Sequence, residues 1–133
     1  LLLEHYRIAW QGKHIVVVGA GRLVGLPTIL RLVMEKATFS SVNEKTKSLA
    51  AFTKQADILI SGAGKPKIIK SSMLKKEAVV IDAGTSLEKG AASGDVDFNN
   101  VVSKVRAITP VPGGVGPLTV ACLFENLFIL SAQ

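Results

Sequence analysis

Apolar residues in this chain of 133 residues fall into short runs, separated by polar segments and by turns rich in glycine and proline. Runs rich in valine, isoleucine and leucine are typical of strands buried on both faces. They predict five strands, over residues 14–18, 38–43, 57–61, 78–82 and 105–108. Apolar positions at helical spacing predict helices between the strands. We expect these over residues 1–10, 27–35, 47–54, 71–74, 97–102 and 118–130.

This alternation of strands and helices predicts the fold class. Repeated strand–helix units imply an α/β protein, with a Rossmann-like, doubly wound and mostly parallel sheet that carries helices on both faces. The polar, turn-rich residues 84–97 predict a hairpin beside it. In such sheets, ligands bind outside the carboxyl ends of the strands. Five loops would converge there, at residues 19–25, 43–46, 62–66, 82–86 and 109–117.

The first of these loops has the pattern G-x-G-x-x-x-G, formed by Gly19, Gly21 and Gly25. In the common dinucleotide fingerprint the third glycine stands one residue earlier, where this chain has Val24. Gly19 would allow the tight turn, Gly21 the close approach of a pyrophosphate, and Gly25 close packing of the helix on the strand. The loop follows a predicted strand and precedes a predicted helix, and this placement favours a dinucleotide site.

The second loop bears on the choice of dinucleotide. Glu44 follows the second predicted strand, where a carboxylate accepts hydrogen bonds from the ribose hydroxyls of NAD and repels the 2′-phosphate of NADP. Lys45 and Lys47 stand beside it and would instead favour a phosphate. The residues favour NAD slightly and leave both cofactors open.

The last loop is the most informative segment of the chain. Six of the eight residues from Pro110 to Pro117 are proline or glycine. Proline fixes φ and removes an N–H group, whereas glycine permits positive φ and close backbone approach. A turn needs only one or two such residues. The segment therefore predicts a stiff, bare backbone that grips a flat ligand.

Composition adds limits on function. Hydrophobic residues make up 48% of the chain and charged residues 20%, which indicates one globular domain with a core. The net charge of +6 attracts anions in general, but no aromatic residues interleave the lysines, so we expect no nucleic acid partner. RNA binding, suggested by the charge alone, remains an alternative function, and the salt dependence of binding would test it. No apolar run reaches the roughly 20 residues that span a bilayer, so we expect no membrane partner.

Other candidate residues favour structural roles. His5 and His14 lack partners at ligand spacing, so we expect no metal. The single cysteine, Cys122, excludes an internal disulfide and is expected in the core. Asp82 is expected to be structural, and Asp95 and Asp97 to serve in turns and helix caps. The closing helix has an apolar stripe that predicts core packing, formed by Phe124, Leu127, Phe128 and Leu130.

Together, these motifs resemble a known family. The matching segments are 12–13, 16–19, 24–27, 45–46, 55–58, 64–66, 79–84, 94–97 and, above all, 108–119. Over nearly its whole length the chain resembles the cofactor domain of bifunctional methylenetetrahydrofolate dehydrogenase/methenyltetrahydrofolate cyclohydrolase. The resemblance implies oxidation of a methylene-tetrahydrofolate with hydride passing to NADP or NAD, followed by hydrolysis to 10-formyltetrahydrofolate.

The resemblance also implies site residues, domains and partners. The residues expected at the cofactor are Gly19, Ala20, Gly21, Asn43, Glu44, Gly64 and Thr85, and those expected to face the folate are Pro112, Gly113, Gly114 and Val115. Residues 1–11 would form a connector helix from a missing N-terminal folate domain, and residues 12–133 the NAD(P)-binding domain. The folate would be shared between the two domains, and the cofactor domains would form a homodimer.

Three departures from the family pattern matter. Gly21 stands where the family usually has serine, which removes a hydroxyl donor to the phosphate. Asn43 and Glu44 stand where it usually has His-Ser, which opposes a 2′-phosphate. The folate domain, with its Tyr-x-x-x-Lys motif, is absent, so we assign no catalytic residue here and expect the isolated chain to bind dinucleotide weakly and to be inactive.

Two other functions remain as alternatives. One is another Rossmann oxidoreductase domain, similar to shikimate dehydrogenase, which would share the glycine loop without the 109–119 segment. The other is a non-catalytic nucleotide-binding or assembly module.

The family works in cytoplasm and in mitochondria, and we expect a cytoplasmic protein, with a mitochondrial one as the alternative.

Overall fold

Five parallel strands form the central sheet of the computed structural model, which describes residues 1–88 and 90–132. The strands are β1 (Ile15–Val18), β2 (Phe39–Val42), β3 (Ile58–Ser61), β4 (Val79–Asp82) and β7 (Ala107–Ile108). Their order is β2-β1-β3-β4-β7, and every neighbouring pair is parallel. The chain order reverses between β1 and β3, which makes that crevice the topological switch point of the sheet.

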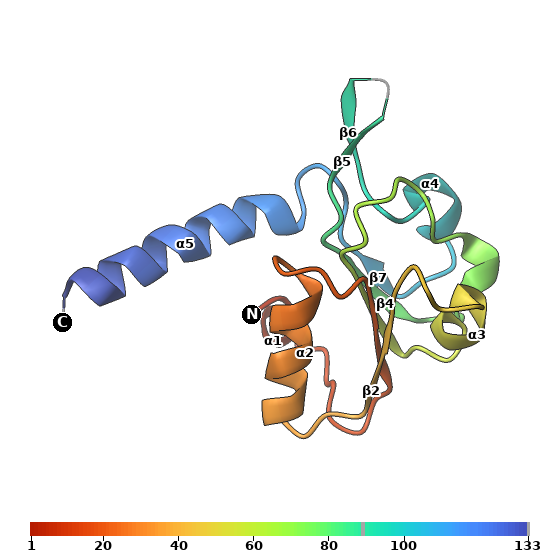
Figure 1. Ribbon diagram of the computed structural model, residues 1–133, viewed down its shortest axis with the longest axis horizontal. Coiled ribbons are helices and arrows are strands. Elements are labelled where there is room, and N and C mark those ends of the chain that lie inside the picture. The colour runs from red at the N-terminus through yellow and green to blue at the C-terminus, as the bar shows by residue number, and fades with distance from the viewer. Residues whose placement is uncertain (89, 133) are drawn as a thin grey trace.

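Helices cover both faces of the sheet, as the sequence predicts (Figure 1). α1 (Leu2–His5) and α2 (Gly25–Met34) lie on one face, whereas α3 (Leu49–Thr53), the 3₁₀ helix η1 (Ser71–Met73) and α4 (Phe98–Val101) lie on the other. The expected hairpin is also present, as the antiparallel pair β5 (Ser86–Glu88) and β6 (Ala91–Ser93). The predicted Rossmann-like α/β class is therefore confirmed.

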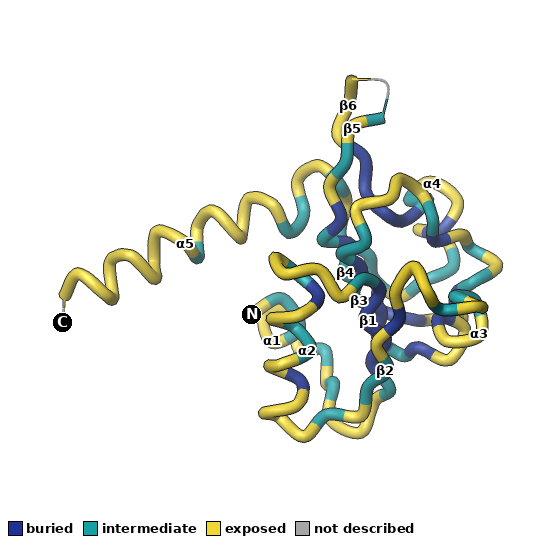
Figure 2. Tube along the Cα trace, in the orientation of Figure 1, coloured by how far each residue is buried: buried dark blue, intermediate teal, exposed yellow. Residues whose placement is uncertain are grey.

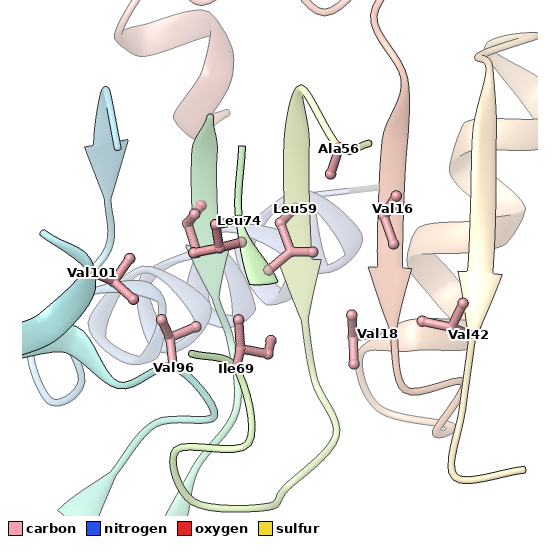
Figure 3. Close-up of a cluster of buried hydrophobic side chains, with 10 residues drawn as sticks. Val16, Val18, Val42, Ala56, Leu59, Ile69, Leu74, Val96 and Val101 are labelled. Atoms are coloured by element: carbon pink, nitrogen blue, oxygen red, sulfur yellow. The ribbon is translucent and has the colours of Figure 1, made fainter. Parts of the chain in front are cut away.

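The core consists of two clusters, one on each face of the sheet. β1 contributes to both, because successive side chains of a strand point to opposite faces. Val16 and Val18 pack with Leu59 on the α3 side (Figure 3), whereas Ile15 and Val17 pack on the α2 side. All four residues of β1 are buried, which explains the uninterrupted apolar run in the sequence.

The first and last helices differ most in extent from the prediction, and the other helix ends differ by no more than two residues. The N-terminal helix ends at His5 instead of continuing to residue 10, because Arg7 takes a left-handed conformation with φ of 52° and turns the chain. The final helix, α5 (Val115–Ser131), begins three residues earlier than expected. Pro117 then lies in its first turn, where the missing N–H group breaks no helical hydrogen bond.

The expected core role of α5 is wrong. α5 contains no buried residue and extends away from the body of the domain (Figures 1 and 2). Its expected core stripe is exposed instead, at 66% for Phe124, 62% for Leu127, 74% for Phe128 and 67% for Leu130. The helix is apolar on every side, so its pattern selects no single face for packing. Among the described residues, no helix is both long and apolar enough to cross a bilayer.

Candidate functional site

The glycine loop after β1 is shaped by close backbone packing. Gly19 has φ of +90°, and a Cβ atom there would lie 2.7 Å from the Gly62 carbonyl oxygen. A Cβ atom at Gly25 would lie 2.7 Å from the Gly19 carbonyl carbon and 2.8 Å from Ala20 Cα. Both positions therefore require glycine, so that the start of α2 can lie directly on the loop.

Gly21 differs from the other two glycines of this loop. A Cβ atom at Gly21 would meet nothing within 4 Å, and the residue does not adopt a positive φ. The packing of the protein thus leaves the space above Gly21 open. Such space suits the close approach of a ligand phosphate, and it would also accept the serine that the resembled family usually has there.

A pocket of about 190 Å³ opens beside the glycine loop. It lies at the carboxyl ends of β1, β2 and β3, on the switch point of the sheet. Its lining residues are Val18, Gly19, Ala20, Gly21, Asn43, Glu44, Leu49, Gly62, Ala63, Lys65 and Ile68. The structure thus brings together five of the seven residues that the sequence assigns to the cofactor, namely Gly19, Ala20, Gly21, Asn43 and Glu44.

The other two expected cofactor residues lie outside this lining. Gly64 is exposed, with φ of +65°, between the lining residues Ala63 and Lys65. Thr85 is exposed after β4, at the start of the hairpin. Both follow the carboxyl ends of strands, and their contact with a cofactor stays a prediction.

The turn after β2 presents Glu44 at its tip. The Asn43 side-chain oxygen accepts a hydrogen bond from the Lys45 amide at 3.0 Å, and Thr46 Oγ1 accepts one from the Asn43 amide at 3.1 Å. The Thr46 amide donates back to the Asn43 carbonyl at 3.0 Å. These bonds fix the backbone on both sides of Glu44, so its exposed side chain is held at the pocket.

The loops after β3 and β4 converge on two buried carboxylates, Asp82 and Asp95. Asp82 accepts hydrogen bonds from the amides of Gly84, Asp95 and Val96 at 2.9–3.1 Å. Burial raises the pKa of the Asp82 carboxyl above its ordinary value. The three amide hydrogen bonds lower this pKa, whereas the nearby Asp95 raises it further. The structural role expected of Asp82 agrees with this geometry.

Asp95, which the sequence suggested for a turn or a helix cap, instead binds the loop after β3. It is fully buried and accepts hydrogen bonds from Ser61 Oγ at 2.7 Å, the Ala63 amide at 2.6 Å and the Lys65 amide at 2.9 Å. A Cβ atom at Gly84 would overlap its carboxyl group. The signals in the sequence that could have indicated this close packing are Gly84 and Gly94, where a Cβ atom would meet the carboxyl groups of Asp95 and Asp82.

The proline- and glycine-rich segment forms the turn from β7 to α5. Of its four expected folate-facing residues, three lie in this turn, Pro112 after a cis peptide bond, Gly113 with φ of +97° and Gly114, and Val115 begins α5. A second, more apolar pocket of about 650 Å³ borders the segment and α1. Gly113 and Gly114 line this pocket together with Leu3, Ile81 and Leu118, whereas Pro112 and Val115 do not.

The histidines and the cysteine have structural surroundings. His14 Nε2 lies 2.9 Å from Ser40 Oγ, and the ring of His5 packs edge-on against Tyr6 at 5.0 Å. Cys122 is half-buried on α5, not in the core as expected. In residues 1–88 and 90–132, no three metal-ligating side chains gather into a possible metal site.

Comparison with known proteins places this geometry in a family. All 133 residues match the family profile described as tetrahydrofolate dehydrogenase/cyclohydrolase, NAD(P)-binding domain. The chain belongs to this family. The sequence-based resemblance is thereby confirmed, and the alternatives of a shikimate-dehydrogenase-like domain and a non-catalytic module are not favoured.

Individual relatives agree with the family assignment. The bifunctional protein FolD of Aquifex aeolicus is 51% identical over 126 residues, which cover 95% of this chain and 43% of that protein. The crystal structure of FolD from Campylobacter jejuni has 46% identity and a TM-score of 0.89, over 94% of this chain and 45% of that one. FolD from Trypanosoma brucei, solved with NADP and an inhibitor, has 37% identity and a TM-score of 0.89, over 99% of this chain and 48% of that one. The chain therefore spans about half the length of the relatives it matches.

Proposed function

We propose that this chain is the cofactor-binding half of a methylenetetrahydrofolate dehydrogenase/methenyltetrahydrofolate cyclohydrolase. The whole protein would transfer hydride from 5,10-methylenetetrahydrofolate to NADP or NAD and then hydrolyse the product to 10-formyltetrahydrofolate. The pocket at the carboxyl ends of β1, β2 and β3 carries the proposal, because it combines the glycine loop with the switch point of the sheet.

The chain's own residues would bind and orient the dinucleotide. The Gly21 backbone, with open space above it, would approach the pyrophosphate at the start of α2. The start of a helix carries a partial positive charge, which favours an anion there. The bound dinucleotide supplies the hydride-accepting chemistry, and the protein supplies its position.

The folate would lie between this domain and an N-terminal domain of the whole protein. Two apolar surfaces support this part of the proposal, namely the 650 Å³ pocket beside Gly113 and Gly114 and helix α5, which contains no buried residue. Exposed apolar surface of this extent marks an interaction site. Pro112 and Val115, in the same proline- and glycine-rich segment, would face the folate. Because we assign no catalytic residue to this chain, we expect the isolated chain to be inactive.

The remaining features of the assembly follow from the family resemblance. We propose a homodimer formed through cofactor domains and a cytoplasmic location, with mitochondria as the alternative. Dimer formation is testable by sedimentation of the full-length protein. Location is testable by fractionation of cells that produce it.

The choice between NAD and NADP rests on Glu44. Its carboxylate is exposed at the pocket, on a turn whose backbone is held by three hydrogen bonds. A negative side chain there would repel a 2′-phosphate and accept bonds from ribose hydroxyls. Lys45 and Lys47 reduce this repulsion. We propose a modest preference for NAD.

Calorimetric titration of this chain with NAD and with NADP tests the proposal. We expect one binding site per chain. Gly21→Leu should weaken binding at least tenfold, because the new side chain enters the open space above the loop. Gly116→Leu is the matched control, since Gly116 also has open space around it but lies outside the pocket. A folded chain that binds neither dinucleotide, or a Gly21→Leu variant that binds as tightly as the original, would contradict the proposed site.

A further inference from the structure

The carboxylate of Asp95 holds the loop that follows β3. Oδ2 accepts hydrogen bonds from Ser61 Oγ at 2.7 Å and the Ala63 amide at 2.6 Å, and Oδ1 accepts one from the Lys65 amide at 2.9 Å. Ala63 and Lys65 both line the pocket beside the glycine loop. One side chain from the segment after the hairpin thus fixes one wall of this pocket.

Asp82 extends the same constraint to two further segments. Its Oδ1 accepts a hydrogen bond from the Asp95 amide at 3.1 Å, so Asp82 holds the backbone that carries Asp95. The Asp82 amide donates to Thr109 Oγ1 at 2.8 Å, at the start of the proline- and glycine-rich segment. A continuous chain of hydrogen bonds therefore joins Thr109, through Asp82 and Asp95, to the loop after β3.

The two carboxylates are closely packed against neighbouring glycines. A Cβ atom at Gly84 would overlap the Asp95 carboxyl, and one at Gly94 would lie 2.9 Å from Asp82 Cγ. Both side chains are buried, and no ion pair of the described residues involves either one. Buried carboxylates are costly and rarely improve stability over apolar packing. Their use here indicates a requirement for fixed loop geometry.

We propose that Asp95 is a positioning residue for the dinucleotide: it holds Ala63 and Lys65 in the arrangement that forms the pocket wall, and Asp82 holds Asp95. The inference rests on the proposed function, because it concerns the affinity of that same pocket for the dinucleotide. Asp95 would affect this affinity without touching the dinucleotide. Charge-assisted bonds such as these are short and about twice as strong as neutral ones, which suits them to this task.

Asp95→Asn tests the inference, because asparagine has the same shape but only one accepting atom. Asp97→Asn is the matched control, two residues away, with the same change of charge; its carboxylate bonds to the side chains of Lys70 and Asn100 and not to the amides of Ala63 or Lys65. Two properties are measured for each variant of this chain, namely the Kd of NAD and NADP by calorimetry and the exchange rates of the Ala63 and Lys65 amides by NMR. We expect Asp95→Asn to weaken dinucleotide binding about tenfold and to speed exchange of both amides about tenfold, with neither change in Asp97→Asn.

The two readouts separate this inference from the proposed function. If Asp95→Asn remains folded, binds as tightly as the original chain and keeps both amides protected, Asp95 does not position the pocket. If the original chain binds neither dinucleotide, the proposed function fails, and the amide exchange alone decides whether Asp95 holds the loop. If Asp95→Asn does not fold, Ser61→Ala replaces it. This variant removes one of the three donors to Asp95, and we expect a smaller loss of affinity, about threefold, in the same direction; unchanged affinity would overturn the inference.

Discussion

A pair of alanine substitutions in the glycine loop tests the packing of α2 against β1. A Cβ atom at Gly25 would lie 2.7 and 2.8 Å from backbone atoms of Gly19 and Ala20, whereas ordinary contact begins near 3.4 Å. The Gly19 carbonyl oxygen would be nearer still, so the helix or the loop must move by more than about 0.7 Å at atoms that no side-chain rotation can displace. Overpacking of this kind costs about 1–3 kcal/mol. Gly21→Ala meets nothing within 4 Å and should change stability by less than about 0.5 kcal/mol.

Urea unfolding monitored by tryptophan fluorescence provides the assay, because Trp10 is the only tryptophan and packs against the α2-side cluster. We expect Gly25→Ala to lower the free energy of unfolding by about 2–3 kcal/mol, near the upper end of the range, because the crowded atoms belong to the backbone. Equal stabilities of Gly25→Ala and Gly21→Ala would refute the reasoning, since only the Cβ atom at Gly25 meets other atoms within 4 Å.

Three further predictions concern cofactor choice, pH dependence and the final helix. Glu44→Ser should shift the ratio of NAD to NADP affinity at least about tenfold toward NADP, or about 1.4 kcal/mol, and an unchanged ratio in calorimetry would exclude Glu44 from the choice. Burial raises the pKa of Asp82, so the folded state keeps the proton of the Asp82 carboxyl at a pH where the unfolded state has lost it. The free energy of unfolding should therefore fall as the pH rises from about 4. Asp82→Asn should reduce this fall in urea unfolding between pH 4 and pH 7. Leu123→Lys and Phe128→Lys, at residues 67% and 74% exposed, should change the free energy of unfolding by no more than about 0.5 kcal/mol. Both variants should reduce self-association in sedimentation. The control Leu59→Ala, at a fully buried residue, should lower the free energy of unfolding by about 2–5 kcal/mol.

Local sequence patterns predicted the elements that carry the pocket. The run Ile15–Val18 is apolar throughout because both of its faces are buried, and this property is visible in four consecutive residues. Gly19 and Gly25 mark the loop between β1 and α2. The spacing of these two glycines follows from the packing of α2 on β1, which are consecutive elements of the chain. Because the carboxyl ends of parallel strands meet at one edge of a sheet, the sequence alone was enough to place Asn43 and Glu44 beside that loop.

Interactions between distant segments were not predictable in the same way. The bonds of Asp95 to Ser61 and Ala63 span more than 30 positions, and no local pattern separates such a buried carboxylate from one in an exposed turn. The helix from Val115 to Ser131 also misled the prediction, because an apolar stripe does not specify what covers it. If our proposal is right, the missing partner is another part of the whole protein, which the sequence of this chain does not contain.

Amide chemical-shift mapping with NAD and NADP tests the location of the dinucleotide site most directly. Our account predicts that saturating dinucleotide shifts the amides of Gly19, Gly21, Glu44 and Ala63, which lie at the carboxyl ends of β1, β2 and β3. Shifts confined to the opposite edge of the sheet, around Lys13, would contradict the site, as would a spectrum that does not change at millimolar concentrations of either dinucleotide.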